Sequence, residues 1–502
     1  MSDIITETCN VLSEIKLGKI SITAYDTAWI ARLGEIDWEL SSKALNWLSE
    51  NQLPDGSWGA DNVYYYHDRV ISTLAAMISL TQRGRRKHDS KQVESGLLAL
   101  ERIIAGVTGG LTADPNGATV GFEMIVPTLV AEAEKMGLIT QQKDRLLGRL
   151  SKMRAQKLSL MQGKLIDRNI SMAYSAEMAG DDNISLFDVK NLQEVNGSVA
   201  NSPSATAYFI SHIDQNNQLA LNYLKKSTNN GQGGASFAFP YDIYERAWIL
   251  WNISIAPSLM DDPSIKEACK PHVEFLKSAW KPGKGVGFAS THSLCDGDDT
   301  SVTFEVLKKF GHELSSETIL GFEADDHFRC YPLEVNPSIG ANAHMLGAFK
   351  EAGFGKDHPA VQKILRYLKK SQLSNGYWID KWHISPYYVT SHVIISCREY
   401  DRELCQSAIH WMLEGQNKDG GWGSIGFSTV EETAYCVQAL KLWQLNGGHV
   451  PARKFNEAGT WLLQNYDKPH PMLWISKSLN SPELVVKMVI LSAISLFKDH
   501  YK

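Results

Sequence analysis

Apolar residues recur at intervals of three and four along most of the chain, which is the period of amphipathic helices. Strict alternation of apolar and polar residues, typical of half-buried strands, is almost absent. The clearest helical runs are Leu97–Ile104, Val126–Lys135, Ile243–Trp251, His344–Glu351 and Val485–Phe497. The pattern therefore predicts an all-α protein.

Two repeated motifs predict how these helices are organised. The motif Gln-x-x-x-Gly-x-Trp begins at Gln52, Gln372 and Gln416. We expect its glutamine to end a helix, its glycine to adopt positive φ in a turn, and its tryptophan to pack back. A Thr-Ala-aromatic motif, which predicts a helix start with an inward aromatic ring, occurs at Thr27-Ala28-Trp29, Thr206-Ala207-Tyr208 and Thr433-Ala434-Tyr435. Repeated helical hairpins with glycine-rich turns indicate α/α barrels around a central pocket, and an open helical solenoid is the alternative.

Size and composition narrow the possible functions. A chain of 502 residues is too long for one ordinary core and predicts two domains of roughly 200–250 residues. A formal net charge of −6 gives no electrostatic case for binding nucleic acid. The N-terminal residues do not resemble a signal peptide, and no 18-residue apolar stretch occurs, so we expect a cytoplasmic protein without membrane insertion. Seven scattered cysteines without a Cys-x-x-Cys pair indicate reduced thiols.

The segment Asp296-Gly297-Asp298-Asp299 is the strongest chemical signal. Three carboxyl groups so close together cannot all stay ionised once buried, because repulsion and desolvation raise at least one pKa. A carboxylic acid that stays neutral at pH 7 can act as a general acid, for example towards a carbon–carbon double bond. Thr300 and Ser301 exclude a calcium loop, whereas a solvated acidic turn or a magnesium clamp remain alternatives.

Five segments stand out in order along the chain: Ala24–Trp29, Gly121–Glu123, Ser202–Tyr208, Asp296–Asp299 and Asp380–Trp382. Together they resemble class II terpene cyclases, and more closely the bacterial class II diterpene cyclases. Within these, the resemblance is greatest to halimadienyl (tuberculosinyl) and kolavenyl diphosphate synthases. The resemblance implies two α/α barrel domains with the active site between them. It implies a β domain of residues 1–38 and 245–502, and a γ domain of residues 39–244 inserted after the first β helix.

The resemblance also implies a reaction, in which protonation starts the bicyclisation of geranylgeranyl diphosphate to a decalin diterpenyl diphosphate that keeps its diphosphate. Asp298 would donate the proton, while Asp296 and Asp299 keep it protonated and oriented. Asn342 matches the position that hydrogen-bonds the acid. We expect His344, two residues further along the predicted helix, to face elsewhere as a structural histidine.

The resemblance further implies residues that bind the substrate. Glu123 matches a carboxylate associated with Mg²⁺ near the diphosphate, although Gly117 stands where bacterial relatives often have aspartate. Lys381 and Lys284 are candidate phosphate partners. No Asp-Asp-x-x-Asp motif occurs, so ionisation of the diphosphate is not expected here. Aromatic candidates for sheltering the carbocation are Trp382, Tyr387 and Tyr388.

Tyr174 bears on the product. In plant copalyl-type cyclases, which the chain resembles, a histidine and an asparagine position a water as base. Tyr174 stands at the position of that histidine, and Phe237 falls roughly at that of the asparagine. A weakly basic aromatic group would let hydride and methyl shifts proceed, which predicts a rearranged halimadane or clerodane diphosphate, with copalyl diphosphate as the alternative. A separate class I diterpene synthase or a phosphatase would then remove the diphosphate.

Other protein classes share α/α barrels. An inverting glycoside hydrolase would need two carboxyl groups ~6.5–9.5 Å apart on separate loops, whereas adjacent acids favour a shared proton. A protein prenyltransferase β subunit would need an Asp/Cys/His zinc site. A non-enzymatic helical scaffold would not need the acid cluster.

Overall fold

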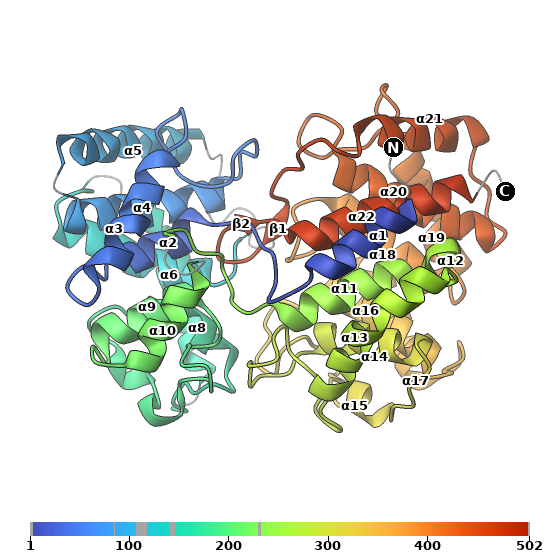
Figure 1. Ribbon diagram of the computed structural model, residues 1–502, viewed down its shortest axis with the longest axis horizontal. Coiled ribbons are helices and arrows are strands. Elements are labelled where there is room, and N and C mark those ends of the chain that lie inside the picture. The colour runs from blue at the N-terminus through green and yellow to red at the C-terminus, as the bar shows by residue number, and fades with distance from the viewer. Residues whose placement is uncertain are drawn as a thin grey trace.

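The chain folds into two helical halves that lie side by side, joined by a short hairpin (Figure 1). The computed structural model describes residues 4–84, 86–106, 118–140, 146–161, 163–228 and 232–499. The hairpin, β1 (Trp474–Ile475) paired with β2 (Leu479–Asn480), is the single sheet among these residues. The prediction of an all-α protein is confirmed.

The larger half, which we call the β domain, is a closed ring of helices built on residues 4–15 and 237–499. Successive inner helices contact one another, and the last contacts the first, so the ring closes. The inner helices are α11 (Asp242–Ser254), α14 (Gly297–Lys309), α16 (Ile339–Glu351), α18 (Pro386–Cys397), α20 (Val430–Leu445) and α22 (Glu483–Lys498). Around them lie α1 (Ile4–Glu14), α12 (Pro257–Met260), α13 (Pro263–Ala279), α15 (Glu317–Leu320), α17 (Pro359–Ser371), α19 (Arg402–Glu414) and α21 (Ala452–Asn465).

The smaller half, the γ domain, is a second closed ring built on residues 24–235. Its inner elements are α2 (Ala24–Ala31), α4 (Tyr66–Arg83), α6 (Phe122–Lys135), the 3₁₀ helix η1 (Ser171–Ala179) and α9 (Pro203–His212). The remaining elements are α3 (Trp38–Glu50), α5 (Lys87–Gly106), α8 (Leu150–Ser159), η2 (Ile184–Leu186), η3 (Val189–Asn191) and α10 (Gln218–Ser227). The two-barrel architecture that the resemblance implied is therefore present.

The chain passes between the domains earlier than the sequence predicted. Residues 1–38 were expected to belong to the β domain, but α2 is an inner helix of the γ ring and contacts α4 and α9. Every residue of α2 is buried, and only a position inside a ring covers a helix on all sides. The crossings lie near residues 16–23 and 236, not at 38 and 245.

The hairpin β1–β2 fastens the two domains together. It follows α21 in the β domain, and the amide of Leu479 donates to the carboxylate of Asp68 in the γ domain at 3.0 Å. Between the strands, the ammonium of Lys477 lies 2.6 Å from the carboxylate of Glu177, and both side chains are fully buried. The ammonium also donates to Ser202 and Ser204, at 2.8 and 2.7 Å.

The Gln-x-x-x-Gly-x-Trp motif folds as expected. In each copy the glutamine amide donates to the carbonyl of the glycine at 2.8 Å, and the glycine has positive φ. Each tryptophan donates its indole N–H to a carbonyl in the preceding helix, that of Leu48, Leu368 or Met412. A fourth copy, Gln193 to Val199, has the same glutamine bond to Gly197 but valine in place of tryptophan, and the sequence analysis missed it.

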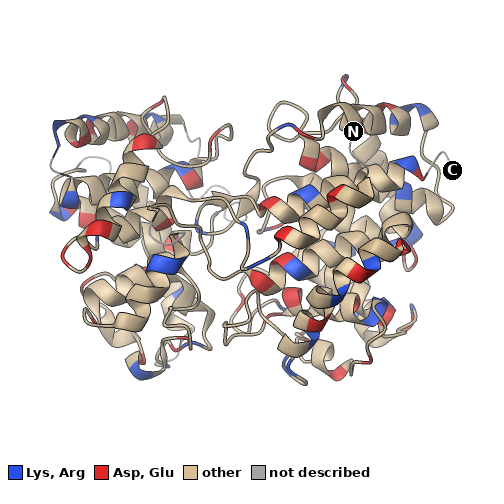
Figure 2. Ribbon diagram, viewed as in Figure 1, with Lys and Arg blue, Asp and Glu red and all other residues tan. Residues whose placement is uncertain are grey.

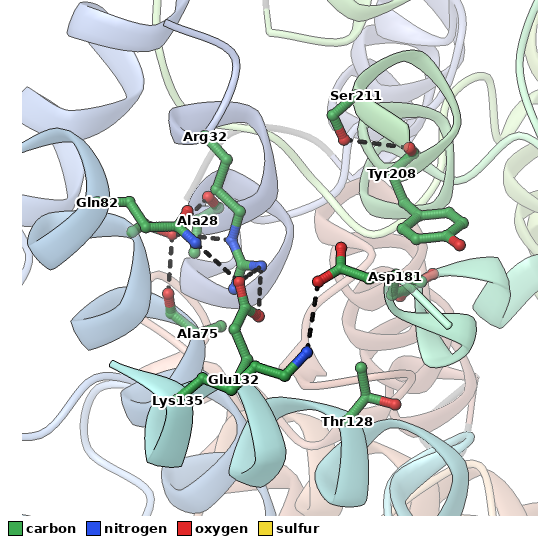
Figure 3. A network of polar contacts seen from close by, with 12 residues as sticks. Ala28, Arg32, Ala75, Gln82, Thr128, Glu132, Lys135, Asp181, Tyr208 and Ser211 are labelled. Atoms are coloured by element: carbon green, nitrogen blue, oxygen red, sulfur yellow. Dashed lines mark hydrogen bonds and ion pairs between the residues drawn. The ribbon is translucent and has the colours of Figure 1, made fainter. Parts of the chain in front are cut away.

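A polar network joins the helices of the γ ring (Figure 3). The guanidinium of Arg32 on α2 lies 2.9 Å from the carboxylate of Glu132 on α6, and the amide of Gln82 on α4 donates to the same carboxylate at 2.8 Å. Lys135 extends the network from α6 to Asp181, at 3.6 Å. The carboxylate of Glu132 thus links α6 to the C-terminal end of α2 by an ion pair and to α4 by a hydrogen bond.

Charged residues of both signs are interspersed over both halves of the molecule (Figure 2). None of the helices in the described ranges combines the length and the apolar character needed to cross a bilayer. The seven cysteines are all free thiols, as their spacing predicted.

Candidate active site

A cavity of about 540 Å³ lies between the two domains and is lined by residues of both. This volume is within the range of small-molecule sites, roughly 300–1,000 Å³. The γ domain contributes side chains that include Glu123, Met124, Lys157, Met172, Tyr174 and Met178. The β domain contributes side chains that include Tyr241, Tyr244, Trp248, Phe288, His292, Asp296, Asp298, Asp299, Tyr331, Lys381, Trp382, Tyr388 and Trp474.

The acidic motif begins helix α14 at the cavity wall. Asp296 is the N-cap residue, and its Oδ1 accepts the backbone N–H groups of Asp298 and Asp299 at 3.0 and 2.8 Å. The amide of Gly297 donates to the carbonyl of Cys330 at 2.9 Å. A side chain at Gly297 would come within 2.3 Å of the carbonyl oxygen of Arg329, so this close approach of two backbones requires glycine.

Asp296 and Asp299 have raised pKa values. Burial raises the pKa of Asp296 to about 7, against hydrogen bonds from Asp299 that lower it. Burial, together with the charge of Asp296, raises the pKa of Asp299 well above its usual range. The pair therefore holds a proton at neutral pH, as the sequence predicted for a buried cluster.

Asp298 is hydrogen-bonded to His344, which is in turn hydrogen-bonded to His392. One of its oxygens lies 2.6 Å from Nδ1 of His344, and Nε2 of His344 lies 2.6 Å from Nδ1 of His392. Burial lowers the pKa of His392 well below its usual range, so this ring is neutral. The expectation that His344 faces away from the acid was wrong, since it is the direct partner of Asp298.

Asn342 has a different position from the one expected. Its side-chain oxygen accepts the amide of Phe328 at 2.8 Å, and its nitrogen donates to the carbonyls of Phe328 and Ser338 at 2.9 and 2.8 Å. In the described part of the chain, these three bonds engage the side-chain oxygen and both N–H groups of Asn342. The expected bond to Asp298 is therefore not made. Asn342 instead fixes the loop that carries Cys330, the backbone partner of Gly297.

The aromatic candidates separate into two groups. Trp382 and Tyr388 line the cavity. Tyr387 does not, because its ring packs on Trp411 of α19 and its hydroxyl donates to the carbonyl of Gly415 at 3.3 Å. Adjacent residues of a helix point about 100° apart, which is why Tyr387 and Tyr388 have different surroundings.

Of the two lysines expected to bind phosphate, Lys381 lines the cavity and Lys284 does not. The ammonium of Lys381 is paired with the carboxylate of Glu334 and the carbonyl of Asn336. Lys284 lies in the turn that links Lys281 to Gly285 and does not line the cavity. A different cation, Lys157 on α8, lines the cavity and forms an ion pair with Glu123.

Glu123 is the residue that could hold Mg²⁺. Its buried carboxylate lies at the cavity wall in the first turn of α6. Gly117, where an aspartate was expected in relatives, lies outside the described residues. Within those residues, no three His, Cys, Asp or Glu side chains form a metal cluster. A single carboxylate still fits Mg²⁺, which is commonly held by one or two carboxylates and the phosphates of a substrate.

Tyr174 lines the cavity from η1, but its hydroxyl is already engaged. It lies 2.6 Å from Oγ of Ser476 and donates to the carbonyl of Phe237 at 3.4 Å. The ammonium of Lys477 sits 4.4 Å from the centre of its ring. Burial, and then the charge of Asp26, raises the pKa of Tyr174 well above its usual range, so the phenol keeps its proton.

Several residues of the site gave little signal in the sequence. Lys157 is one of 50 Lys and Arg residues, and nothing local marks it. Trp248 and Tyr244, stacked with ring centres 4.1 Å apart on α11, could have been found from the helical run that begins at Ile243. His392 could have been found as a polar side chain in the apolar helix α18.

Comparison with known proteins agrees with this site and fold. Residues 333–441 match the squalene-hopene cyclase C-terminal domain. The chain is 46% identical over 492 residues to a type B diterpene cyclase from Mycobacterium tuberculosis, covering 97% of this chain and 98% of that protein. It is 28% identical over 513 residues to a (+)-kolavenyl diphosphate synthase from Herpetosiphon aurantiacus, covering 95% and 94%. An ent-copalyl diphosphate synthase from Streptomyces platensis has the same fold, with a TM-score of 0.79, 24% identity and 99% of each chain covered. The chain therefore belongs to the class II diterpene cyclases.

Proposed function

We propose that this cyclase protonates geranylgeranyl diphosphate at its terminal double bond and closes two rings while the diphosphate is retained. The main support is Asp298, whose side chain is 14% exposed and is held by a buried histidine at the wall of an aromatic cavity. A general acid placed in this way faces an apolar substrate without bulk water between them.

The histidine chain supports Asp298 as the proton donor. If His392 donates its Nδ1 hydrogen to Nε2 of His344, then His344 must carry its own hydrogen on Nδ1 and donate it to Asp298. In that arrangement one oxygen of Asp298 is an acceptor, and the other oxygen is the one that would carry the proton to be donated. As the proton leaves, negative charge develops on Asp298 and the bond from His344 strengthens, which stabilises the transition state.

Asp296 and Asp299 support renewal of that proton. Their raised pKa values keep a proton within the motif at neutral pH, next to the residue that must be reprotonated after each turnover. The first turn of α14 stabilises the negative charge that remains on the motif after proton transfer.

The two domains supply the two ends of the substrate site. Near the acid, the β domain places Trp248, Tyr244 and Tyr388 at the cavity wall, where each aromatic face can stabilise a carbocation by ~2 kcal/mol. The γ domain supplies Lys157, which can donate charge-assisted hydrogen bonds to the diphosphate. Glu123 would hold Mg²⁺, which when bound neutralises diphosphate charge.

Tyr174 favours a rearranged product. A phenol that keeps its proton and is bonded to Ser476 cannot accept a proton from the first bicyclic cation. Hydride and methyl shifts then precede proton loss, which gives a halimadane or clerodane diphosphate. The name of the kolavenyl diphosphate synthase relative is in keeping with this product class.

The proposal is tested by incubating the purified chain with geranylgeranyl diphosphate and Mg²⁺, removing the diphosphate with a phosphatase, and identifying the alcohol. A bicyclic rearranged alcohol is expected. Unrearranged copalol would refute the product assignment, and recovery of unchanged geranylgeraniol would refute the substrate. Because the diphosphate is retained, a second enzyme, a class I diterpene synthase or a phosphatase, would act on the product.

A further inference from the structure

His292 and Glu194 face each other across the domain boundary, at the edge of the cavity. His292 comes from the β-domain loop that leads into the acidic motif. Glu194 comes from the γ domain, in the copy of the Gln-x-x-x-Gly motif that begins at Gln193. Nδ1 of the imidazole lies 3.3 Å from Oε1 of the carboxylate, and both side chains are buried. The pair therefore exists only when the two domains are docked.

The surroundings of Glu194 keep its carboxylate ionised and fix its direction. Oε1 accepts the backbone N–H of Ser293 at 2.9 Å, and Oε2 accepts the hydroxyl of the same residue at 2.5 Å. Burial acts to raise the pKa of Glu194, but the neighbouring imidazole of His292 and the hydrogen bonds from Ser293 outweigh it, so the pKa is lowered. A fixed carboxylate opposite Nδ1 favours the imidazole tautomer with hydrogen on Nδ1, which leaves the lone pair on Nε2.

His292 lines the cavity, and it is the one histidine of the described ranges that does so. Its ring packs against Phe288, with ring centres 4.4 Å apart. His344 and His392 are engaged with Asp298 and with each other, behind the cavity wall. Tyr174 cannot serve as a base because its phenol keeps its proton and is bonded to Ser476.

From this placement we infer that His292 is the base that ends the reaction, with Glu194 and Ser293 as residues that position it. The inference rests on the proposed function. In the final step a C–H bond next to the cationic carbon breaks, its electron pair forms the new carbon–carbon double bond, and the proton goes to Nε2 of His292. The imidazolium is stabilised by Glu194 and later releases the proton to solvent. Asp298 supplies one proton and His292 removes one, so the overall reaction is an isomerisation.

The test is the product distribution of His292→Phe and His292→Asn, measured by gas chromatography and mass spectrometry after dephosphorylation. His292→Phe keeps an aromatic ring against Phe288 without a base. We expect both variants to consume geranylgeranyl diphosphate within about tenfold of the wild-type rate, because initiation at Asp298 is intact. We expect the main product to fall below half of the total, with other alkene isomers or a hydroxylated product in its place.

Two further variants separate a base from a structural residue. Glu194→Gln should give the same new products as the His292 variants, in smaller proportion, because it removes the carboxylate that selects the tautomer. His312→Asn is the matched control, since His312 also faces a glutamate, Glu274 at 3.8 Å, but lies away from the cavity. It should give the wild-type products.

Unchanged product proportions in both His292 variants, with melting temperatures showing that each is folded, would overturn the inference while leaving the proposed function intact. If His312→Asn shifted the products as far as His292→Phe did, the inference would also be overturned, because a general loss of packing would explain both. Failure of the wild-type chain to convert geranylgeranyl diphosphate would instead remove the proposed function on which the inference rests.

Discussion

Replacing His344 with phenylalanine tests whether the hydrogen bond between His344 and Asp298 makes Asp298 a stronger acid. The substitution keeps a ring of similar size and removes the N–H group that lies 2.6 Å from Asp298. A hydrogen bond is worth ~0.5–1.5 kcal/mol to a neutral group and ~1.5–3 kcal/mol to a charged one. The bond thus favours the carboxylate over the acid by about 1–1.5 kcal/mol, which corresponds to about 5- to 13-fold in the rate of proton transfer. Loss of the acid's orientation adds to this figure.

The assay is steady-state conversion of geranylgeranyl diphosphate, with kcat and KM determined separately. We expect kcat of His344→Phe to fall at least about fivefold, and KM to stay within about twofold because His344 does not line the cavity. His344→Gln, which retains an N–H donor, should recover part of the loss. A kcat within twofold of the wild-type value, or a KM that rises as much as kcat falls, would refute the reasoning.

Three further predictions concern substrate binding, domain docking and pH. Lys157→Met should raise KM by about 10- to 150-fold through loss of a charge-assisted bond, and Lys157→Arg should not; equal KM values for the two variants would contradict this. Lys477→Met leaves Glu177 buried without its ion-pair partner, so the free energy of unfolding should fall by ~3–5 kcal/mol, and adding Glu177→Gln should restore part of it; chemical denaturation measures both, and a change below 1 kcal/mol would argue against the pair. Because Asp296 and Asp299 have raised pKa values, raising the pH through about 7 and beyond removes the stored proton, so kcat should fall with increasing pH; a kcat that increases steadily to pH 9 would contradict the assignment.

The repeats allowed much of the fold to be predicted, because each places a backbone constraint on a few adjacent residues. The bond from Gln416 to the carbonyl of Gly420 is local, and an equivalent bond is made in every copy of the motif. The assignment of α2 to the β domain failed because burial on all sides looks the same in sequence whichever ring surrounds the helix. The copy at Gln193 was missed because Val199 replaces the tryptophan that made the motif visible.

The acid itself could be predicted from its sequence, but its partners depend on which way a helix is turned. Asn342 and His344 are two positions apart on α16, about 200° around the helix, so only one of them can face Asp298. Asn342 was expected to face Asp298 for this reason, but His344 is the residue that does. Lys157 could not be found, since its pairing with Glu123 depends on how α8 packs on α6.

Turnover of geranylgeranyl diphosphate by Asp298→Asn tests the central claim most directly, because the amide keeps the size of the side chain and removes the acidic proton. The variant should fold with a melting temperature close to that of the wild-type chain and lose about 10²- to 10⁴-fold in kcat. A folded Asp298→Asn enzyme that forms the bicyclic diphosphate within tenfold of the wild-type rate would contradict the assignment of Asp298 as the proton donor.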